Sequence, residues 1–200
     1  MIKLYGWWST NPQKVRMALE ELSLAYDYQE IDLGRGRHRA AEYRAIHPRG
    51  KVPALQIDDC LLWESGAALM YLATREGRLW PSDRAAVAQA TNLLFFESSA
   101  FQESAGVHFF NRCILPSIGK EGDQGRVEKA QRALAPHLVL LNEQLGQQDF
   151  LLGDLTVVDL AFAPWLPWLD LQEYPKIVSW RQRLMARPSW QACGIRSPQD

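Results

Sequence analysis

Hydroxyl and amide side chains lie side by side near the N-terminus, in the segment Ser9-Thr10-Asn11. An apolar run over residues 2–6 precedes it and apolar residues at helical spacing follow it, so the segment is expected to join a strand to a helix. A hydroxyl there could donate to a ligand thiolate, and this hydrogen bond and the helix dipole would lower the pKa of the thiol. Capping of the helix explains the same residues equally well.

A basic cluster follows between residues 35 and 51, where Glu42 is the only acidic residue. Its members are Arg35, Arg37, His38, Arg39, Arg44, Arg49 and Lys51. The cluster could bind a small anion, and a solvated helix face is an equally good interpretation.

Two further features lie at predicted strand ends. Pro53, in the segment KVPAL, could follow a cis peptide bond that leaves the main chain of Val52 free to pair with a peptide-like ligand. A trans proline that begins an edge strand is the more common arrangement. The segment Glu64-Ser65-Gly66 begins a helix directly after a strand, where free N–H groups would attract a carboxylate, although capping by Ser65 is the simpler interpretation.

The hydrophobic pattern predicts the elements that position these features. Strands are expected over 2–6, 26–33, 53–57 and 60–63, and a helix over 64–75. The first helix is expected to begin at the Asn11-Pro12 junction, with asparagine as its N-cap, and a short helix follows the basic cluster. The order β-α-β-α-β-β-α predicts a mixed four-stranded sheet, in which all four features fall at one edge.

The second half of the chain has helical period only. Residues 79–84, LWPSDR, contain turn residues, and helices are expected over 85–112, 126–145, 156–169 and 175–186. We therefore expect an α/β domain over 1–78, a linker over 79–84 and an all-helical domain over 85–200. Thr156 and Asp159 have the spacing of a capping box, which serves folding rather than catalysis.

The composition argues against several classes of function. The 200 residues are 47% hydrophobic and can bury a core, and the formal net charge of -1 favours neither nucleic acid nor a membrane surface as partner. The chain shows no signal-peptide pattern and no apolar run long enough to span a membrane. The three cysteines, Cys60, Cys113 and Cys193, lack the spacing of a disulfide framework or a metal site, so we expect no metal and a cytoplasmic location.

Four segments together resemble the cytosolic glutathione S-transferases over essentially the whole chain. They are STNPQKVRMALEEL, HPRGKVPAL, the pair Glu64-Ser65 and FLLGDLTVVDLAFAPWL. The resemblance implies a thioredoxin-like N-terminal domain, an all-α helical bundle domain, glutathione as co-substrate and a homodimer.

The resemblance also implies a source for thiolate stabilisation. Ser9 falls where serine-type members of the family place the hydroxyl that stabilises the glutathione thiolate. Asn11 resembles the second thiolate-contacting residue of the Nu and Ure2-like classes, which have threonine where this chain has Ser9. Thr10 is a neighbouring alternative.

The remaining contacts to glutathione follow from the same resemblance. His38 and Lys51 resemble the contacts to the glycyl carboxylate, and Val52 the residue whose main chain pairs with the cysteinyl unit ahead of a cis Pro53. Glu64 and Ser65 resemble the contacts to the γ-glutamyl unit. Ser65 and the helix N-terminus would bind its α-carboxylate, and Glu64 would bind its ammonium group.

One departure from the family pattern concerns Trp7-Trp8, where many relatives have a smaller residue and a proline. The two rings could line or partly close the pocket for the electrophile, or pack against the helical domain. Phe101, Phe109 and Trp165 are conceivable pocket walls, although aromatic residues at helical spacing more often belong to a core.

The function that we expect is that of a glutathione transferase, which activates the glutathione thiolate for attack on an apolar electrophile. Asn11 favours a second hypothesis, a glutathione-dependent disulfide reductase or peroxidase, although position 9 holds no cysteine. The third hypothesis is a non-catalytic binding protein that has the glutathione-transferase fold without the transferase activity.

Overall fold

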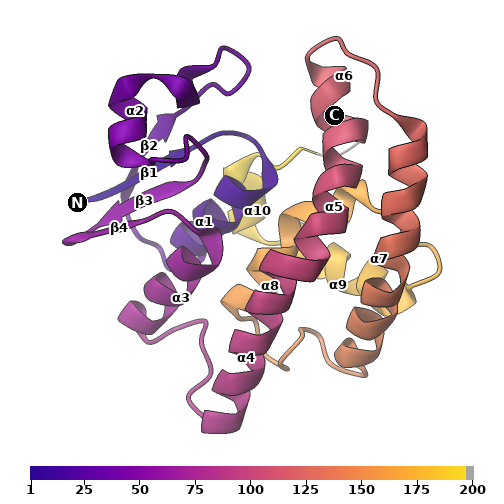
Figure 1. The fold of residues 1–200 in the computed structure, drawn as a ribbon. Coiled ribbons are helices and arrows are strands. Elements are labelled where there is room, and N and C mark those ends of the chain that lie inside the picture. Colours follow the sequence, from indigo (N-terminus) through magenta and orange to yellow (C-terminus); the bar gives the residue numbers. More distant parts are fainter. Residues whose placement is uncertain (197–200) are drawn as a thin grey trace.

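A mixed four-stranded sheet forms the N-terminal part of the computed structural model, which describes residues 1–196 (Figure 1). The strands β1 (Ile2–Gly6), β2 (Tyr26–Glu30), β3 (Ala54–Ile57) and β4 (Cys60–Leu62) lie in the order β2-β1-β3-β4. β1 pairs parallel with β2 and antiparallel with β3, which pairs antiparallel with β4. The predicted mixed sheet is confirmed, although β2 ends earlier than expected because the chain turns at residues 33–36.

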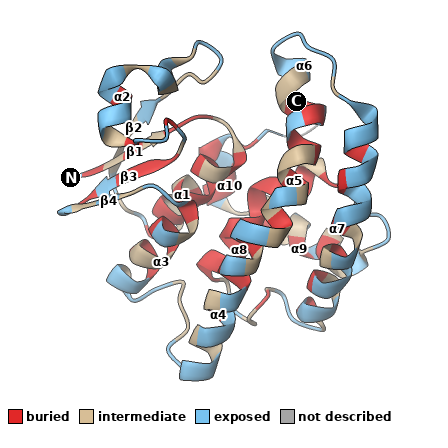
Figure 2. Ribbon diagram, in the orientation of Figure 1, coloured by how far each residue is buried: buried red, intermediate tan, exposed pale blue. Residues whose placement is uncertain are grey.

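Three helices flank this sheet. α1 (Thr10–Glu21) and α3 (Ser65–Glu76) lie on one side, and α2 (Ala41–Ile46) lies on the other, after a 3-10 turn at Arg37–Arg39 (Figure 1). α1 is buried on most of its surface, because it packs against α3 on one side and against helices of the C-terminal half on the other (Figure 2).

The start of α1 differs from the sequence prediction. Ser9, not Asn11, is the N-cap residue, with extended backbone angles of φ -69° and ψ 164°, and its side chain makes no capping hydrogen bond. Pro12 is the third helical residue, which is tolerated because the first four N–H groups of a helix have no partner within it. Asn11 therefore lies inside the first turn of α1, at the positive end of the helix.

The C-terminal half is helical, and its longest predicted helix is interrupted. The helix expected over 85–112 consists of α4 (Arg84–Phe96) and α5 (Gln102–Phe109), joined by the π-helical segment Glu97–Phe101. A second π-helical segment, Phe110–Ile114, leads into the short α6 (Leu115–Ser117). The extra residue in each π turn shifts the faces that the following turns present.

The remaining helices complete the C-terminal half. α7 (Gln124–Leu145) and α9 (Pro175–Met185) agree with the sequence apart from their ends, and α10 (Pro188–Cys193) was not predicted. The helix expected over 156–169 is α8 (Val157–Phe162) followed by the 3-10 segment Ala163–Trp168. This segment contains two prolines, which remove the N–H groups that an α-helix needs.

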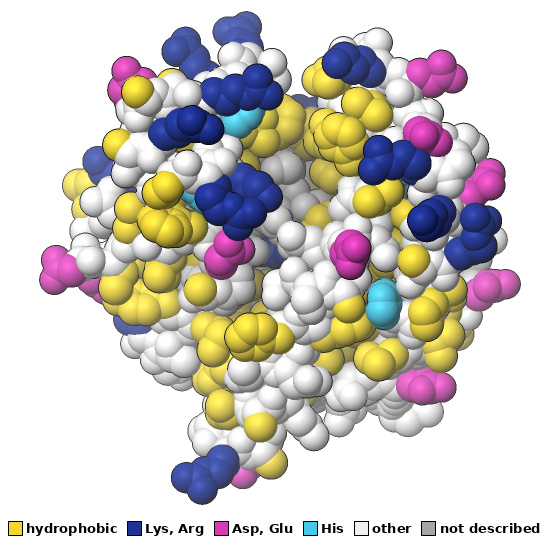
Figure 3. Space-filling view, viewed as in Figure 1, with side chains coloured by type: hydrophobic (Ala, Val, Ile, Leu, Met, Phe, Trp, Pro, Cys, Tyr) yellow, Lys and Arg dark blue, Asp and Glu magenta, His cyan; other side chains and the backbone are white. Residues whose placement is uncertain are grey.

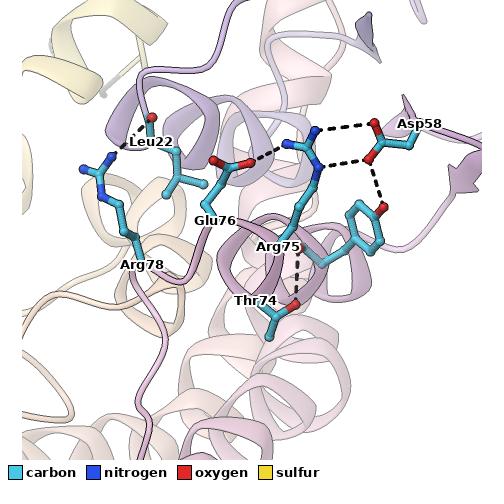
Figure 4. Close-up of polar contacts among 7 residues, drawn as sticks. Leu22, Asp58, Thr74, Arg75, Glu76 and Arg78 are labelled. Carbon is cyan, nitrogen blue, oxygen red and sulfur yellow. Dashed lines mark hydrogen bonds and ion pairs between the residues drawn. The ribbon is translucent and has the colours of Figure 1, made fainter.

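α3 is tied to the β-hairpin and to α1 by polar contacts (Figure 4). Arg75 Nε donates to Asp58 Oδ2 at 2.9 Å, and the hydroxyl of Tyr71 donates to the same oxygen at 3.1 Å. Arg78 donates to the main-chain oxygen of Leu22 at 3.4 Å. These contacts hold the C-terminal half of α3 and the residue Arg78 after it against the β3–β4 turn and the end of α1.

The division into domains at residues 78 and 84 stays a prediction. α3 ends at Glu76 and α4 begins at Arg84, and one hydrophobic core continues across both halves. None of the helices within residues 1–196 combines the length and hydropathy that crossing a membrane requires.

Candidate functional site

A cleft of about 580 Å³ opens between the sheet half and the helical half. Figure 3 shows the surface hollowed between the region of α2 and the region of α5 and α6, with Lys and Arg side chains gathered on the α2 side. Six of the eight predicted site residues line the cleft: Asn11, Lys51, Val52, Pro53, Glu64 and Ser65.

The segment Lys51-Val52-Pro53 forms one wall of the cleft. The Val52–Pro53 peptide bond is cis, as the resemblance implied. The β1–β3 ladder ends at Tyr5 and Ala54, so the main chain of Val52 lies beyond the last paired residues of the sheet. The hydroxyl of Tyr43 donates to the main-chain oxygen of Lys51 at 2.6 Å and holds the segment in place.

The start of α3 forms the adjoining wall. Glu64 is its N-cap residue, and the cleft is lined by the first three helical residues, Ser65, Gly66 and Ala67. Ser65 is buried, whereas Glu64 is exposed and has Arg49 3.7 Å from one carboxylate oxygen. The N–H groups that lack partners within the helix therefore lie at the cleft, where they can bind a carboxylate.

The first turn of α1 contributes Asn11. Its Oδ1 atom is buried and makes no hydrogen bond within the described residues. Ser9 and Thr10 are not among the described residues that line the cleft. Asn11 is thus the polar side chain through which α1 reaches the cleft, at the positive end of the helix dipole.

His38 is not among the described residues that line the cleft and lies in the 3-10 turn Arg37–Arg39. Its Nε2 atom accepts a hydrogen bond from Arg39 Nε at 3.3 Å. Burial lowers the pKa of His38, and the neighbouring Arg39 and Arg44 lower it further, so the imidazole is less ready to carry a positive charge. The main chain of His38 still approaches Gly50, at which an added Cβ would lie 2.6 Å from the His38 oxygen.

The structure adds lining residues that the sequence did not single out. The sheet half contributes His47, Trp63 and Met70 beside Arg49 of the basic cluster, and the helical half contributes Leu94, Phe95, Ser98 and Gln102. Leu94, Ser98 and Gln102 recur every four residues, which is a helical-face signal that could have identified them as a group. No group of three or more metal-binding side chains occurs within residues 1–196.

The two tryptophans before Ser9 pack against each other, and Trp8 also packs against the helical half, and neither is among the described residues that line the cleft. The rings of Trp7 and Trp8 lie 4.7 Å apart, and the ring of Trp8 lies 6.2 Å from that of Phe109. Phe101 and Trp165 are buried in the helical core with Phe109. None of these five aromatic residues is among the described residues that line the cleft.

Comparisons with known proteins agree with this arrangement. The family model "Glutathione S-transferase, N-terminal domain" matches residues 1–74, and "Glutathione S-transferase, C-terminal domain" matches residues 124–192. The chain is 30% identical to glutathione S-transferase 2 of Schizosaccharomyces pombe, over 91% of this chain and 89% of that protein. It is also 30% identical to the disulfide-bond oxidoreductase YfcG of Escherichia coli, over 94% of this chain and 92% of that protein.

Protein URE2 of Eremothecium gossypii is 33% identical over 90% of this chain, which spans 63% of the length of that protein. Among solved structures, Ure2p in complex with glutathione has 27% identity and a TM-score of 0.83, over 96% of this chain and 92% of that chain. Since both family models match and a named transferase aligns over almost its full length, the chain belongs to the glutathione S-transferase family.

Proposed function

We propose that the protein is a glutathione transferase that binds reduced glutathione in the cleft and activates its sulfur as a thiolate for attack on an apolar electrophile. The observation that carries the proposal is the meeting of two helix N-termini, those of α1 and α3, with Lys51 and the main chain of Val52 in one cleft. Such a cleft offers separate positions for a thiolate and two carboxylates.

Glutathione would lie along the sheet-side wall. The Lys51 ammonium group binds the glycyl carboxylate, and the main chain of Val52 pairs with the cysteinyl unit. Ser65 and the first turn of α3 bind the γ-glutamyl α-carboxylate, and Glu64 binds the ammonium group of the same unit. His38 remains a predicted second contact to the glycyl carboxylate.

This placement directs the sulfur toward the first turn of α1. Asn11 lines the cleft there and Ser9 is the N-cap, so both remain the proposed contacts, with the direct hydrogen bond assigned to the Asn11 carboxamide. The thiol proton leaves to solvent, and the thiolate forms a bond to the electrophile as the leaving group departs with its electron pair. Catalysis then consists of a lowered thiol pKa and proximity.

The test compares Asn11→Ala and Ser9→Ala with the unaltered protein. We expect Asn11→Ala to lower kcat for conjugation by about tenfold or more and Ser9→Ala to lower it less, because a hydrogen bond to a charged group contributes about 1.5–3 kcal/mol. Glutathione affinity, measured by calorimetry, should stay nearly the same in both variants. Equal turnover in all three proteins would remove both residues from the mechanism.

A second function, glutathione-dependent disulfide reduction, is favoured by the position of Asn11 in the cleft. In that reaction the activated thiolate attacks a mixed disulfide, forms oxidised glutathione and releases the second thiol. Assays of a mixed glutathione disulfide beside a halogenated aromatic compound distinguish the two functions. Binding of glutathione without turnover of either compound would favour a non-catalytic binding protein.

The family resemblance extends the proposal to assembly and location, namely a homodimer in the cytoplasm. Sedimentation of the purified chain tests the dimer directly. A monomer at micromolar concentration would contradict it.

A further inference from the structure

A buried lysine lies beneath the cleft, one turn along α1 from Asn11. Lys14 is 0% exposed, and its Nζ atom donates to Glu97 Oε1 at 2.6 Å and to Gln102 Oε1 at 3.4 Å. Glu97 also accepts a hydrogen bond from Trp165 Nε1 at 2.8 Å. The ammonium group therefore joins the sheet half to the π-helical segment and the first residue of α5.

The contact with Lys14 determines which way the Gln102 carboxamide faces. A lysine ammonium group has donors only, so the amide oxygen of Gln102 must face it. The Nε2 group is then directed away from Lys14, and no hydrogen bond from it occurs within residues 1–196. Since Gln102 lines the cleft, its free N–H groups are available to an acceptor that enters there.

The Gln102 amide and the first turn of α1 line the same cleft. Asn11 and Lys14 are three residues apart in the helix and so lie on the same face, about 5–6 Å apart at their Cβ atoms. Gln102 bonds to Lys14 and lines the same cleft as Asn11. Two carboxamides, one from each half of the chain, therefore line the cleft in which the proposed function places the glutathione sulfur.

From this geometry we infer that Gln102 donates a second hydrogen bond, through Nε2, to the thiolate of bound glutathione, with Lys14 and Glu97 as positioning residues. The inference rests on the proposed function, because it needs glutathione in the cleft. Gln102 supplies the N–H donor, and Lys14 holds the Gln102 carboxamide so that this N–H group is directed away from Lys14. Glu97 balances the buried charge.

Glu97 is needed because burial works against a charged Lys14. Desolvation lowers the pKa of Lys14, while the Glu97 carboxylate opposes this effect through its charge and its hydrogen bond. A protonated Lys14 cannot accept from the amide, so the orientation of Gln102 is kept. The pair acts on the thiolate through Gln102, because Lys14 and Glu97 are not among the described residues that line the cleft.

The experiment measures the pKa of the bound thiol from the ultraviolet absorbance of the thiolate as a function of pH. We expect Gln102→Met to raise this pKa by about one unit, which leaves about tenfold less thiolate below the pKa. Gln102→Glu should raise it further, because it places an acceptor and a negative charge beside the sulfur. The control Ser99→Ala, on the same helical stretch but exposed and outside the cleft, should leave the pKa unchanged.

The double variant Lys14→Met/Glu97→Gln tests the positioning role. It removes both charges and keeps an acceptor for Trp165, so the fold is not left with a lone buried charge. We expect the thiol pKa to rise by a similar amount and Gln102→Met to have little further effect in this background. Independent, additive shifts would overturn the positioning role.

The same titration separates failure of the inference from failure of the proposed function. If the unaltered protein binds glutathione without lowering its thiol pKa, the proposed activation is wrong and the inference falls with it. If the unaltered protein lowers the pKa and Gln102→Met leaves it lowered, only the role of Gln102 is overturned. A Gln102→Met variant that changes only the KM of the electrophile would also contradict a bond to the sulfur.

Discussion

Lys51 and His38 differ in how they can serve an anionic ligand. Lys51 is an exposed ammonium group on the cleft wall. His38 lies outside the lining, in a turn with two arginines, and its pKa is lowered by burial and by the charges of Arg39 and Arg44. Lys51 is therefore better suited than His38 to place a full positive charge beside an anionic ligand in the cleft.

At this scale we predict that Lys51→Met raises the KM for glutathione by about tenfold or more with little change in kcat, because a hydrogen bond to a charged group contributes about 1.5–3 kcal/mol. His38→Ala should raise KM less than Lys51→Met does. Steady-state kinetics with glutathione as the varied substrate provide the measurement. An effect of His38→Ala as large as that of Lys51→Met would show that His38 contributes to glutathione binding as much as Lys51 does.

At the scale of elements, the start of α8 depends on one carboxylate. The capping box expected from the sequence is present, with Asp159 bonded to the main-chain N–H and the hydroxyl of Thr156. Asp159 also accepts from Leu151 N at 2.9 Å and from Trp180 Nε1 at 3.0 Å, and it is fully buried. Its role therefore extends from capping α8 to joining it to the loop before it and to α9.

These contacts predict unequal costs for two alanine substitutions. Thr156→Ala should lower the free energy of unfolding by about 1 kcal/mol, which is typical of a lost cap. Asp159→Ala should lower it by about 3 kcal/mol or more, because the Leu151 and Trp180 donors also lose their buried acceptor. Urea unfolding at neutral pH measures both, and equal costs would show that the two additional bonds contribute nothing.

The pH dependence of the same variants provides a control. Burial raises the pKa of Asp159 to about 6, although the hydrogen bonds to its carboxylate act to lower it. An aspartate in the unfolded chain has a pKa of about 3.9. The folded state thus binds the proton more strongly, and this contribution to stability is lost as pH rises from about 4 to about 6. The difference between the unaltered protein and Asp159→Ala should therefore grow as pH falls through this range.

At the scale of the whole molecule, polar contacts within the core hold the two halves together. The Lys14–Glu97 ion pair is almost completely buried, and Arg16 donates to the main-chain oxygen of Cys193 at 3.0 Å. Glu21 accepts hydrogen bonds from Arg187, the N-cap residue of α10, and from the hydroxyl of Ser189 within α10. α1 is therefore the element through which the halves are joined.

We predict that Glu97→Ala lowers the free energy of unfolding by about 3–5 kcal/mol, because it leaves the Lys14 ammonium group buried without a counter-charge. The double variant Lys14→Met/Glu97→Gln should lower the free energy of unfolding by less than Glu97→Ala does. As a control, Arg35→Ala, which removes the exposed Arg35–Asp32 pair, should change stability by no more than about 1 kcal/mol. Denaturant unfolding provides the comparison, and a Glu97→Ala loss no larger than that of the double variant would show that the counter-charge is not required.

Local signals were sufficient for the sheet and for the wall of the cleft that it forms. Alternating or continuous apolar runs predicted all four strands, and the KVPAL segment predicted Pro53 at the entry to β3. The start of α1 was placed two residues late, because the Asn11-Pro12 pair has good capping chemistry at a place where the backbone is already helical.

The amino-acid sequence by itself determined the family, the mixed sheet, the helical second half and most of the predicted residues that line the sheet side of the cleft. These features depend on periodicity and short motifs, which are properties of neighbouring residues. Only the tertiary structure decided that Asn11 and not Ser9 lines the cleft, that Trp8 packs against Phe109, and that Lys14, Glu97 and Gln102 meet. Lys14 lies more than eighty positions before Glu97 and Gln102 in the sequence, and their contact exists only because α1 packs against the helical half and takes both members of the ion pair out of water.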